Sequence, residues 1–101
     1  MVRATLWMTV KAGREKEFEA AWRMIADQVR RVPGNLRQTL LREPENPSGF
    51  VLMSDWESRE AFTRFERSEE QDKLTAPLRQ LRESARMSVY ELIAHVEPEG
   101  E

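Results

Sequence analysis

The sequence predicts an α+β fold in which helices cover one face of a four-stranded antiparallel sheet. Four segments show the alternation or the short apolar run that is typical of strands, and two regions between them repeat apolar residues at helical spacing. A chain of 101 residues, 40% of them hydrophobic, can build one modest core. We therefore expect a single domain over residues 1–96, followed by a disordered acidic tail over residues 97–101, where no apolar residue provides an anchor.

The first half of the chain predicts a strand, a helix and a second strand. Residues 2–10 alternate strictly, with the apolar side chains at the even positions. A helix follows whose apolar face starts at Phe18, and the pair Pro33 and Gly34 ends it. Residues 35–43 then alternate again, which suits a strand with two mixed faces.

The second half repeats this order. A turn rich in proline, asparagine and glycine at residues 43–49 leads to a strand at residues 50–56, and Ser58 suits the N-cap of the next helix. We expect the helical region after it to be interrupted at residues 75–77, where a threonine caps a new helix and a proline occupies its first turn. Residues 86–96 alternate and predict the closing strand. The order β-α-β-β-α-β is that of the ferredoxin-like fold.

One face of the predicted sheet carries large apolar side chains that no helix would cover. They are Trp7, Val51, Met53, Tyr90 and Leu92. A continuous apolar patch of this size is rarely left in water, and a second copy of the chain is the economical cover for it. The sequence therefore predicts a homodimer that forms through the open sheet face.

The composition excludes several function classes. The 16 basic and 18 acidic residues are interspersed, which argues against a nucleic-acid partner. There is no cysteine, and a single histidine, His95, cannot build a histidine pair for a metal. The four glycines are too scattered for a phosphate-cradling loop, and no signal peptide or membrane span is visible. We expect a cytoplasmic protein without metal, organic cofactor or membrane partner.

Three stretches, "VKAGREKEFEAAW", "VPGNLRQTLLREPENP" and "FVLMSDWESREAFTRFERSEE", follow one another in a specific order and spacing. Through them nearly the whole chain resembles the antibiotic biosynthesis monooxygenase family of dimeric α+β barrels. The later stretch "LTAPLRQLRESARMSVYEL" looks most like members from aromatic polyketide pathways. The resemblance implies a dimer with a pocket between the sheet and the helices. It leaves the reaction open, because the family includes quinol and anthrone oxygenases, haem-degrading enzymes and isomerase-like members.

Cofactor-free oxidation of an anthrone, quinol or aromatic polyketide by dioxygen needs only a dry pocket that favours the substrate anion. For this reaction we take Trp56 as the central residue and Arg42 or Arg86 as the partner of an oxyanion. The expected aromatic and apolar walls are Trp22, Phe50, Leu52, Phe62 and Phe65. Each of these residue types also fills protein cores, so packing is the competing interpretation for the walls, and solvent exposure is the competing one for the arginines.

Two departures from the family pattern leave alternatives open. The cofactor-free anthrone oxygenases of the family carry an asparagine four residues before the tryptophan and a tyrosine six residues after it, where this chain has Leu52 and Phe62. The histidines of the haem-degrading and quinol-oxidising members have no counterpart between Glu57 and Ala94. A polyketide cyclase, with Arg42 or Arg86 polarising a carbonyl, and a non-catalytic dimer that binds an aromatic ligand are therefore the alternatives.

Overall fold

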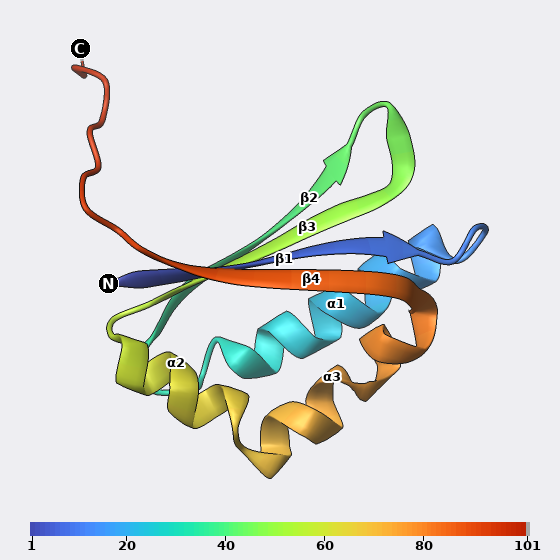
Figure 1. Cartoon of the computed structure of the whole chain (residues 1–101), viewed down its shortest axis with the longest axis horizontal. Helices are drawn as coiled ribbons and strands as arrows, with labels where there is room; N and C mark the ends of the chain where they lie inside the picture. Colours follow the sequence, from blue (N-terminus) through green and yellow to red (C-terminus); the bar gives the residue numbers. More distant parts are fainter. Residues whose placement is uncertain (101) are drawn as a thin grey trace.

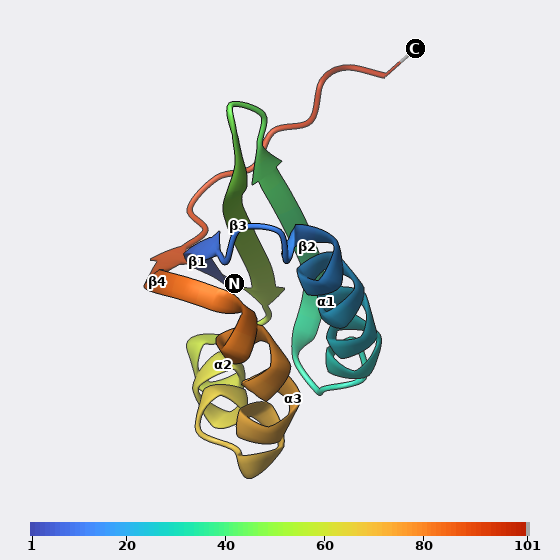
Figure 2. The same ribbon diagram turned by 90° about the vertical axis from the view of Figure 1, so that its right-hand side faces the viewer.

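The computed structural model describes residues 1–100 and shows one sheet with helices packed on one side of it (Figure 1). The elements are β1 (Val2–Val10), α1 (Glu15–Val29), β2 (Asn35–Glu43), β3 (Asn46–Trp56), α2 (Arg59–Glu66), α3 (Glu69–Leu81) and β4 (Arg82–Glu91). The strand order is β2-β3-β1-β4 and all neighbouring strands are antiparallel. The predicted ferredoxin-like α+β fold is confirmed. Figure 2, turned by a quarter, shows that the other face of the sheet carries no helix.

The strict alternation of β1 decides which side chains meet the helices. Its even positions are paired with the even positions of β3, so that Leu6 is opposite Leu52 and Met8 is opposite Phe50. Met8 and Phe50 are 4% and 1% exposed, because α1 and α3 cover this face. Phe18, from α1, is fully buried against Phe50, with ring centroids 5.0 Å apart. The hydrophobic core therefore lies between one sheet face and the helices.

The connection after α1 follows the predicted helix stop. Val29 is the last residue of α1, and Gly34 has a φ of 92°, which side chains other than glycine rarely adopt. The carbonyl of Gly34 accepts a hydrogen bond of 2.8 Å from the amide of Glu57, and a Cβ at Gly34 would lie 2.5 Å from Cβ of Ala61. The glycine thus lets the start of β2 lie against the start of α2.

The third strand starts earlier than the sequence predicts. It begins at Asn46 rather than at residue 50, so the turn is only Pro44 and Glu45. The register jumps from the pair Arg42 and Phe50 to the pair Glu43 and Asn46. This bulge leaves the residues between Asn46 and Phe50 without a partner on β2, and strands accept proline and glycine at such positions.

The predicted interruption of the second helical region is wrong. α3 is continuous and contains Pro77, and Ser68 is its N-cap, with its side chain accepting a 3.0 Å hydrogen bond from the amide of Gln71. Thr75 does not cap a helix; its hydroxyl donates to the carbonyl of Gln71 at 2.9 Å. Burial of two leucines that follow the proline in α3 offsets its cost: Leu78 and Leu81 are 4% and 5% exposed.

The closing strand is also displaced from its predicted range. β4 spans Arg82–Glu91 instead of residues 86–96, because its partner β1 begins at Val2, opposite Glu91. Residues 92–100 have no regular secondary structure, and the last residue of the predicted tail, Glu101, lies outside the described residues. No helix within residues 1–100 combines the length and the apolar character that a membrane span requires.

Candidate functional site

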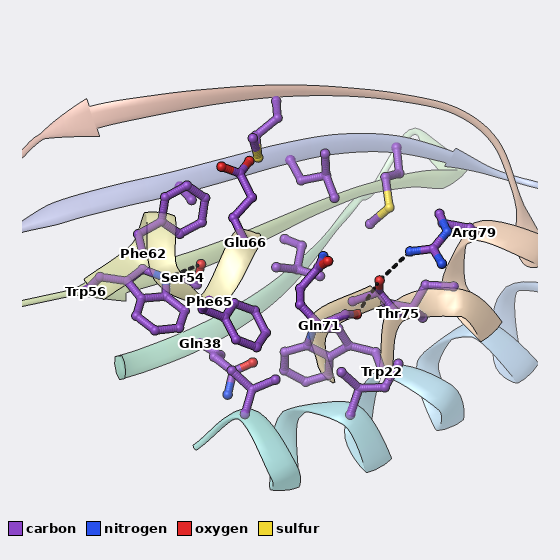
Figure 3. A pocket seen from close by; sticks show the side chains of 18 of the residues that line it. Trp22, Gln38, Ser54, Trp56, Phe62, Phe65, Glu66, Gln71, Thr75 and Arg79 are labelled. Atoms are coloured by element: carbon purple, nitrogen blue, oxygen red, sulfur yellow. Dashed lines mark hydrogen bonds between the residues drawn. The ribbon is translucent and has the colours of Figure 1, made fainter. Parts of the chain in front are cut away.

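A pocket of about 180 Å³ lies between the helix-facing side of the sheet and the three helices (Figure 3). Its walls come from all four strands and all three helices, so the packing of the whole fold forms it. The volume is below the roughly 300–1,000 Å³ of common small-molecule pockets. The occupant that fits without a rearrangement is therefore small or flat.

Aromatic side chains form one end of this pocket. The Trp56 ring stacks on Phe65, with centroids 5.2 Å apart, and meets the edge of Phe62 at 5.9 Å. Trp56 is 1% exposed, and its indole N–H donates a 2.9 Å hydrogen bond to Ser54 Oγ. The indole donor thus already has an acceptor, and Trp56 contributes a flat wall rather than a free hydrogen bond. Two further residues that the sequence predicted as pocket walls, Trp22 and Leu52, also line the pocket.

Three of the predicted site residues lie elsewhere. Phe50 packs on Phe18 in the core and does not line the pocket. Arg42, near the end of β2, lies on the helix side but forms an exposed ion pair with Glu19 at 3.3 Å. Arg86 lies opposite Trp7 on the helix-free face, with its guanidinium carbon 4.4 Å from the Trp7 ring centroid. Neither Arg42 nor Arg86, the two alternative partners expected for an oxyanion, lines the pocket. For Arg86 the reason is the alternation of side chains along β4, which directs it to the helix-free face.

The polar lining comes instead from residues that the sequence analysis did not select. Beside Gln38 and Ser54, the polar side chains along the pocket are Glu66, Gln71, Thr75, Arg79 and Arg82. Helical spacing could have identified two of them as neighbours of other lining residues. Glu66 follows Phe62 by four residues and Arg79 follows Thr75 by four, so each pair shares one face of its helix. No such signal existed for Arg82, which is the first residue of β4.

The charged groups of the pocket have different surroundings. Arg79 donates from Nη1 to Thr75 Oγ1 at 2.5 Å and from Nη2 to the carbonyl of Asp72 at 2.8 Å. Burial, and secondarily the charge of Arg79, lower the pKa of Arg82. Within residues 1–100, neither Arg82 nor Glu66 has an ion-pair partner within 4.0 Å. These are the charges that remain free for a ligand.

Candidate metal ligands do not gather anywhere in the described part of the chain. No group of three or more histidine, cysteine, aspartate or glutamate side chains within residues 1–100 is arranged to hold a metal ion. The single histidine, His95, lies after β4 and contacts Glu97 at 3.1 Å, and it does not line the pocket.

An ion-pair network occupies the helix-free face of the sheet. Asp55 is 1% exposed, with its carboxylate 2.7 Å from Nε of Arg3 and 3.1 Å from Nη1 of Arg37. The hydrogen bond from Arg3 holds the pKa of Asp55 below its usual value against the opposing effect of burial. Asp55 therefore stays ionised and fixes the two flanking strands, on the side of the sheet opposite to the pocket.

Comparison with known proteins identifies relatives of both sequence and fold. The sequence model of the family described as antibiotic biosynthesis monooxygenase matches residues 1–76. Protein SchA of Streptomyces halstedii is 32% identical over 77 residues, and a 42.8 kDa protein in the whiE locus of Streptomyces coelicolor is 36% identical over 77 residues. Both matches cover 76% of this chain, which spans only about a fifth of the length of these two relatives (20% and 19%).

The solved structures agree with this result. SnoaB, a cofactor-independent oxygenase from Streptomyces nogalater, superposes with a TM-score of 0.85 at 26% identity, covering 96% of this chain and 97% of SnoaB. A protein from Deinococcus radiodurans with the same family description has a TM-score of 0.85 at 17% identity, covering 99% of this chain and 100% of that chain, and supports the fold alone.

Proposed function

Because this chain belongs to the antibiotic biosynthesis monooxygenase family, we propose that it is a cofactor-independent monooxygenase. Its substrate in this proposal is an aromatic polyketide, anthrone or quinol-type compound, and its oxidant is dioxygen. The observation that carries the proposal is the aromatic pocket whose lining includes one carboxylate, Glu66, that has no ion-pair partner among residues 1–100. The similarity to SnoaB, a cofactor-independent oxygenase, supports the same reaction class.

The proposed reaction balances without an added reductant. An anthrone methylene loses a proton to a base, and the resulting carbanion supplies the electrons to dioxygen. One oxygen atom becomes the new carbonyl, the other leaves as water with the two methylene hydrogens, and the product is the quinone. The protein has to hold the ring system, accept the proton and exclude bulk water.

The lining residues can divide these tasks. Phe65, which is stacked on Trp56, provides the aromatic surface against which a fused ring system packs. Glu66 is the carboxylate next to this surface, and we assign it the role of proton acceptor. Leu52 and Phe62 keep this end of the pocket apolar, so that the carbanion forms away from bulk water.

Replacement of Glu66 by glutamine should lower kcat for oxygen uptake by about 100-fold or more, because the amide cannot accept the proton. Uptake is followed with an oxygen electrode, with a reduced anthrone or quinol and no added metal or cofactor. Glu60→Gln, on the same helix but away from the pocket, is the matched control and should keep the wild-type rate. Equal uptake with and without the protein across several such substrates would remove the proposal.

A non-catalytic aromatic-ligand-binding dimer is the second candidate function. The observation that favours it is the apolar lining at Leu52 and Phe62, where the related anthrone oxygenases carry polar side chains. Binding of an anthrone without turnover, in air and with intact Glu66, would support this candidate. A cyclase lacks such support, because Arg42 and Arg86 do not line the pocket.

The helix-free face of the sheet is the proposed homodimer interface. Trp7, Val51 and Met53 are adjacent on β1 and β3, and Leu41 and Tyr90 on the outer strands are 46% and 49% exposed. An apolar face with the buried Asp55 network beside it suits a self-complementary contact between two copies.

Trp7→Asp should therefore convert a dimer into a monomer, because the carboxylate would have to lose its water in the interface. Size-exclusion chromatography with light scattering gives the mass. Met24→Asp is the control, since Met24 is 71% exposed on α1 and lies away from the sheet face. A wild-type protein that is monomeric at all accessible concentrations would contradict the proposed interface.

A further inference from the structure

One hydroxyl group interrupts the apolar face that β3 presents to the helices. The even positions of this strand lie on the covered face, where Phe50, Leu52 and Trp56 all belong to the core or pack against it. Ser54 is the exception on this face. It is paired with Ala4 on β1, lines the pocket and is only partly buried. Because the residue lies on the covered face, the accessible part of Ser54 faces the pocket.

Trp56 holds the hydroxyl of Ser54 in place. The indole N–H donates to Ser54 Oγ at 2.9 Å, and because an indole nitrogen can only donate, Ser54 is the acceptor in this contact. A hydroxyl has one hydrogen and two lone pairs, and the contact occupies one lone pair, so the hydrogen of Ser54 stays available. Accepting a hydrogen bond also polarises the O–H bond and makes it a stronger donor.

No protein group takes this hydrogen. Among residues 1–100, the bond from Trp56 is the only hydrogen bond of Ser54 Oγ. Its partners across the ladder are Ala4, which has no side-chain acceptor, and Gln38, whose amide nitrogen donates to the carbonyl of Ala26 at 3.0 Å. Figure 3 shows Ser54 beside Trp56 at the aromatic end of the pocket. A fixed donor without an acceptor in a mostly apolar cavity favours a ligand oxygen at this point.

We propose that Ser54 is a further catalytic residue, whose hydroxyl donates a hydrogen bond to a ring oxygen of the substrate. This inference rests on the proposed function and specifies its substrate class: a fused ring system in which a ketone or phenol oxygen is conjugated with the reacting carbon. When Glu66 takes the proton from that carbon, the electron pair is delocalised onto this oxygen. Ser54 keeps its own proton throughout. Because hydrogen bonds to anions are stronger than those to neutral oxygens, Ser54 stabilises the anion more than the bound substrate.

The binding test uses 2-naphthol, a two-ring phenol that suits the small pocket and changes its absorbance when it ionises. Its spectrum is titrated with pH under nitrogen, where no oxidation competes, in the presence of saturating protein. Ser54→Ala should raise the pKa of the bound naphthol by about 1 relative to the wild type, because the anion loses a donor. Glu66, Arg79 and Arg82 line the pocket in both proteins, so their charges act equally on both values. Failure of the naphthol to bind the wild type would overturn the inference.

Matched variants separate this hydrogen bond from a purely structural role of the serine. Ser54→Thr retains a hydroxyl and should keep the pKa of the bound naphthol close to the wild-type value. Ser84→Ala removes an exposed serine of β4 that does not line the pocket, and should leave this pKa unchanged. Circular dichroism verifies that each variant is folded.

A second background excludes the indole as a replacement donor. Ser54→Ala leaves the N–H of Trp56 without its acceptor, so the substitution is repeated in a Trp56→Phe protein, where the pKa of the bound naphthol should rise by at least as much. A serine that only satisfies the indole would lower the stability of Ser54→Ala and leave the naphthol unaffected. A pKa of the bound naphthol that Ser54→Ala changes in neither background would overturn the inference.

Oxygen uptake separates this inference from the proposed function. With an anthrone as substrate, Ser54→Ala should lower kcat by about 10- to 100-fold and change KM by about twofold or less, because the hydrogen bond gains strength only as the anion forms. A kcat that Ser54→Ala changes in neither background would leave the oxygenase in place and remove Ser54 from its catalysis. A raised pKa of the bound naphthol in Ser54→Ala, without any oxygen uptake by the wild type, would keep the hydroxyl site and remove the oxygenase.

Discussion

Trp56→Ala should lower the free energy of unfolding by about 3–5 kcal/mol, the usual cost of removing a large aromatic side chain from a core. Trp56 is 1% exposed and contacts both Phe62 and Phe65, so its removal opens a cavity between β3 and α2 that the two rings cannot close. The variant also loses the hydrogen bond to Ser54. Urea denaturation followed by circular dichroism measures the change.

The control for Trp56 separates packing from ligand binding. Trp56→Phe keeps an aromatic ring in the core and loses mainly the 2.9 Å hydrogen bond, so the expected cost is about 1–2 kcal/mol. If Trp56 is also the stacking surface, this folded variant should bind an aromatic ligand more weakly than the wild type. A cost below about 1 kcal/mol for Trp56→Ala would show that the residue is not a core anchor.

Gly34→Ala should destabilise the protein by about 2–5 kcal/mol, from two additive causes. The φ of 92° places a non-glycine residue in the left-handed region, at a cost of about 1–2 kcal/mol. The new Cβ would also lie 2.5 Å from Cβ of Ala61, an atom fixed to α2, so the helix itself would have to move. The connection between α1 and β2 would then separate from the start of α2.

Gly13→Ala is the matched control for this substitution. Gly13 has a similar φ of 83°, but nothing lies within 4 Å of the position that its Cβ would take. The control should cost only about 1–2 kcal/mol, because the backbone term remains and the clash is absent. Thermal or urea unfolding of the two variants side by side gives the difference. Equal destabilisation would show that contact with Ala61 does not restrict Gly34.

Local patterns were sufficient for the fold and for part of the pocket. The alternation of residues 2–10 and the helical spacing from Phe18 predicted the element types and the covered face, because both periods report directly which side chains face the core. Together with the pocket that the family resemblance implies, this reasoning placed Trp22, Leu52 and Trp56 along the pocket. It failed at Pro77, where the burial of neighbouring leucines outweighs a local helix-breaking preference.

The sequence by itself determined the element order, the ferredoxin-like fold, the family and the aromatic end of the pocket. Tertiary structure alone decided which arginines have access to that pocket. Arg86 is directed to the other face by the period of two, whereas Arg82 is turned inward by a bulge that depends on how β4 pairs with β1. Strand pairing is a long-range property, and a one-residue shift reverses the face of a side chain, so the polar end of the site could not be read from local spacing.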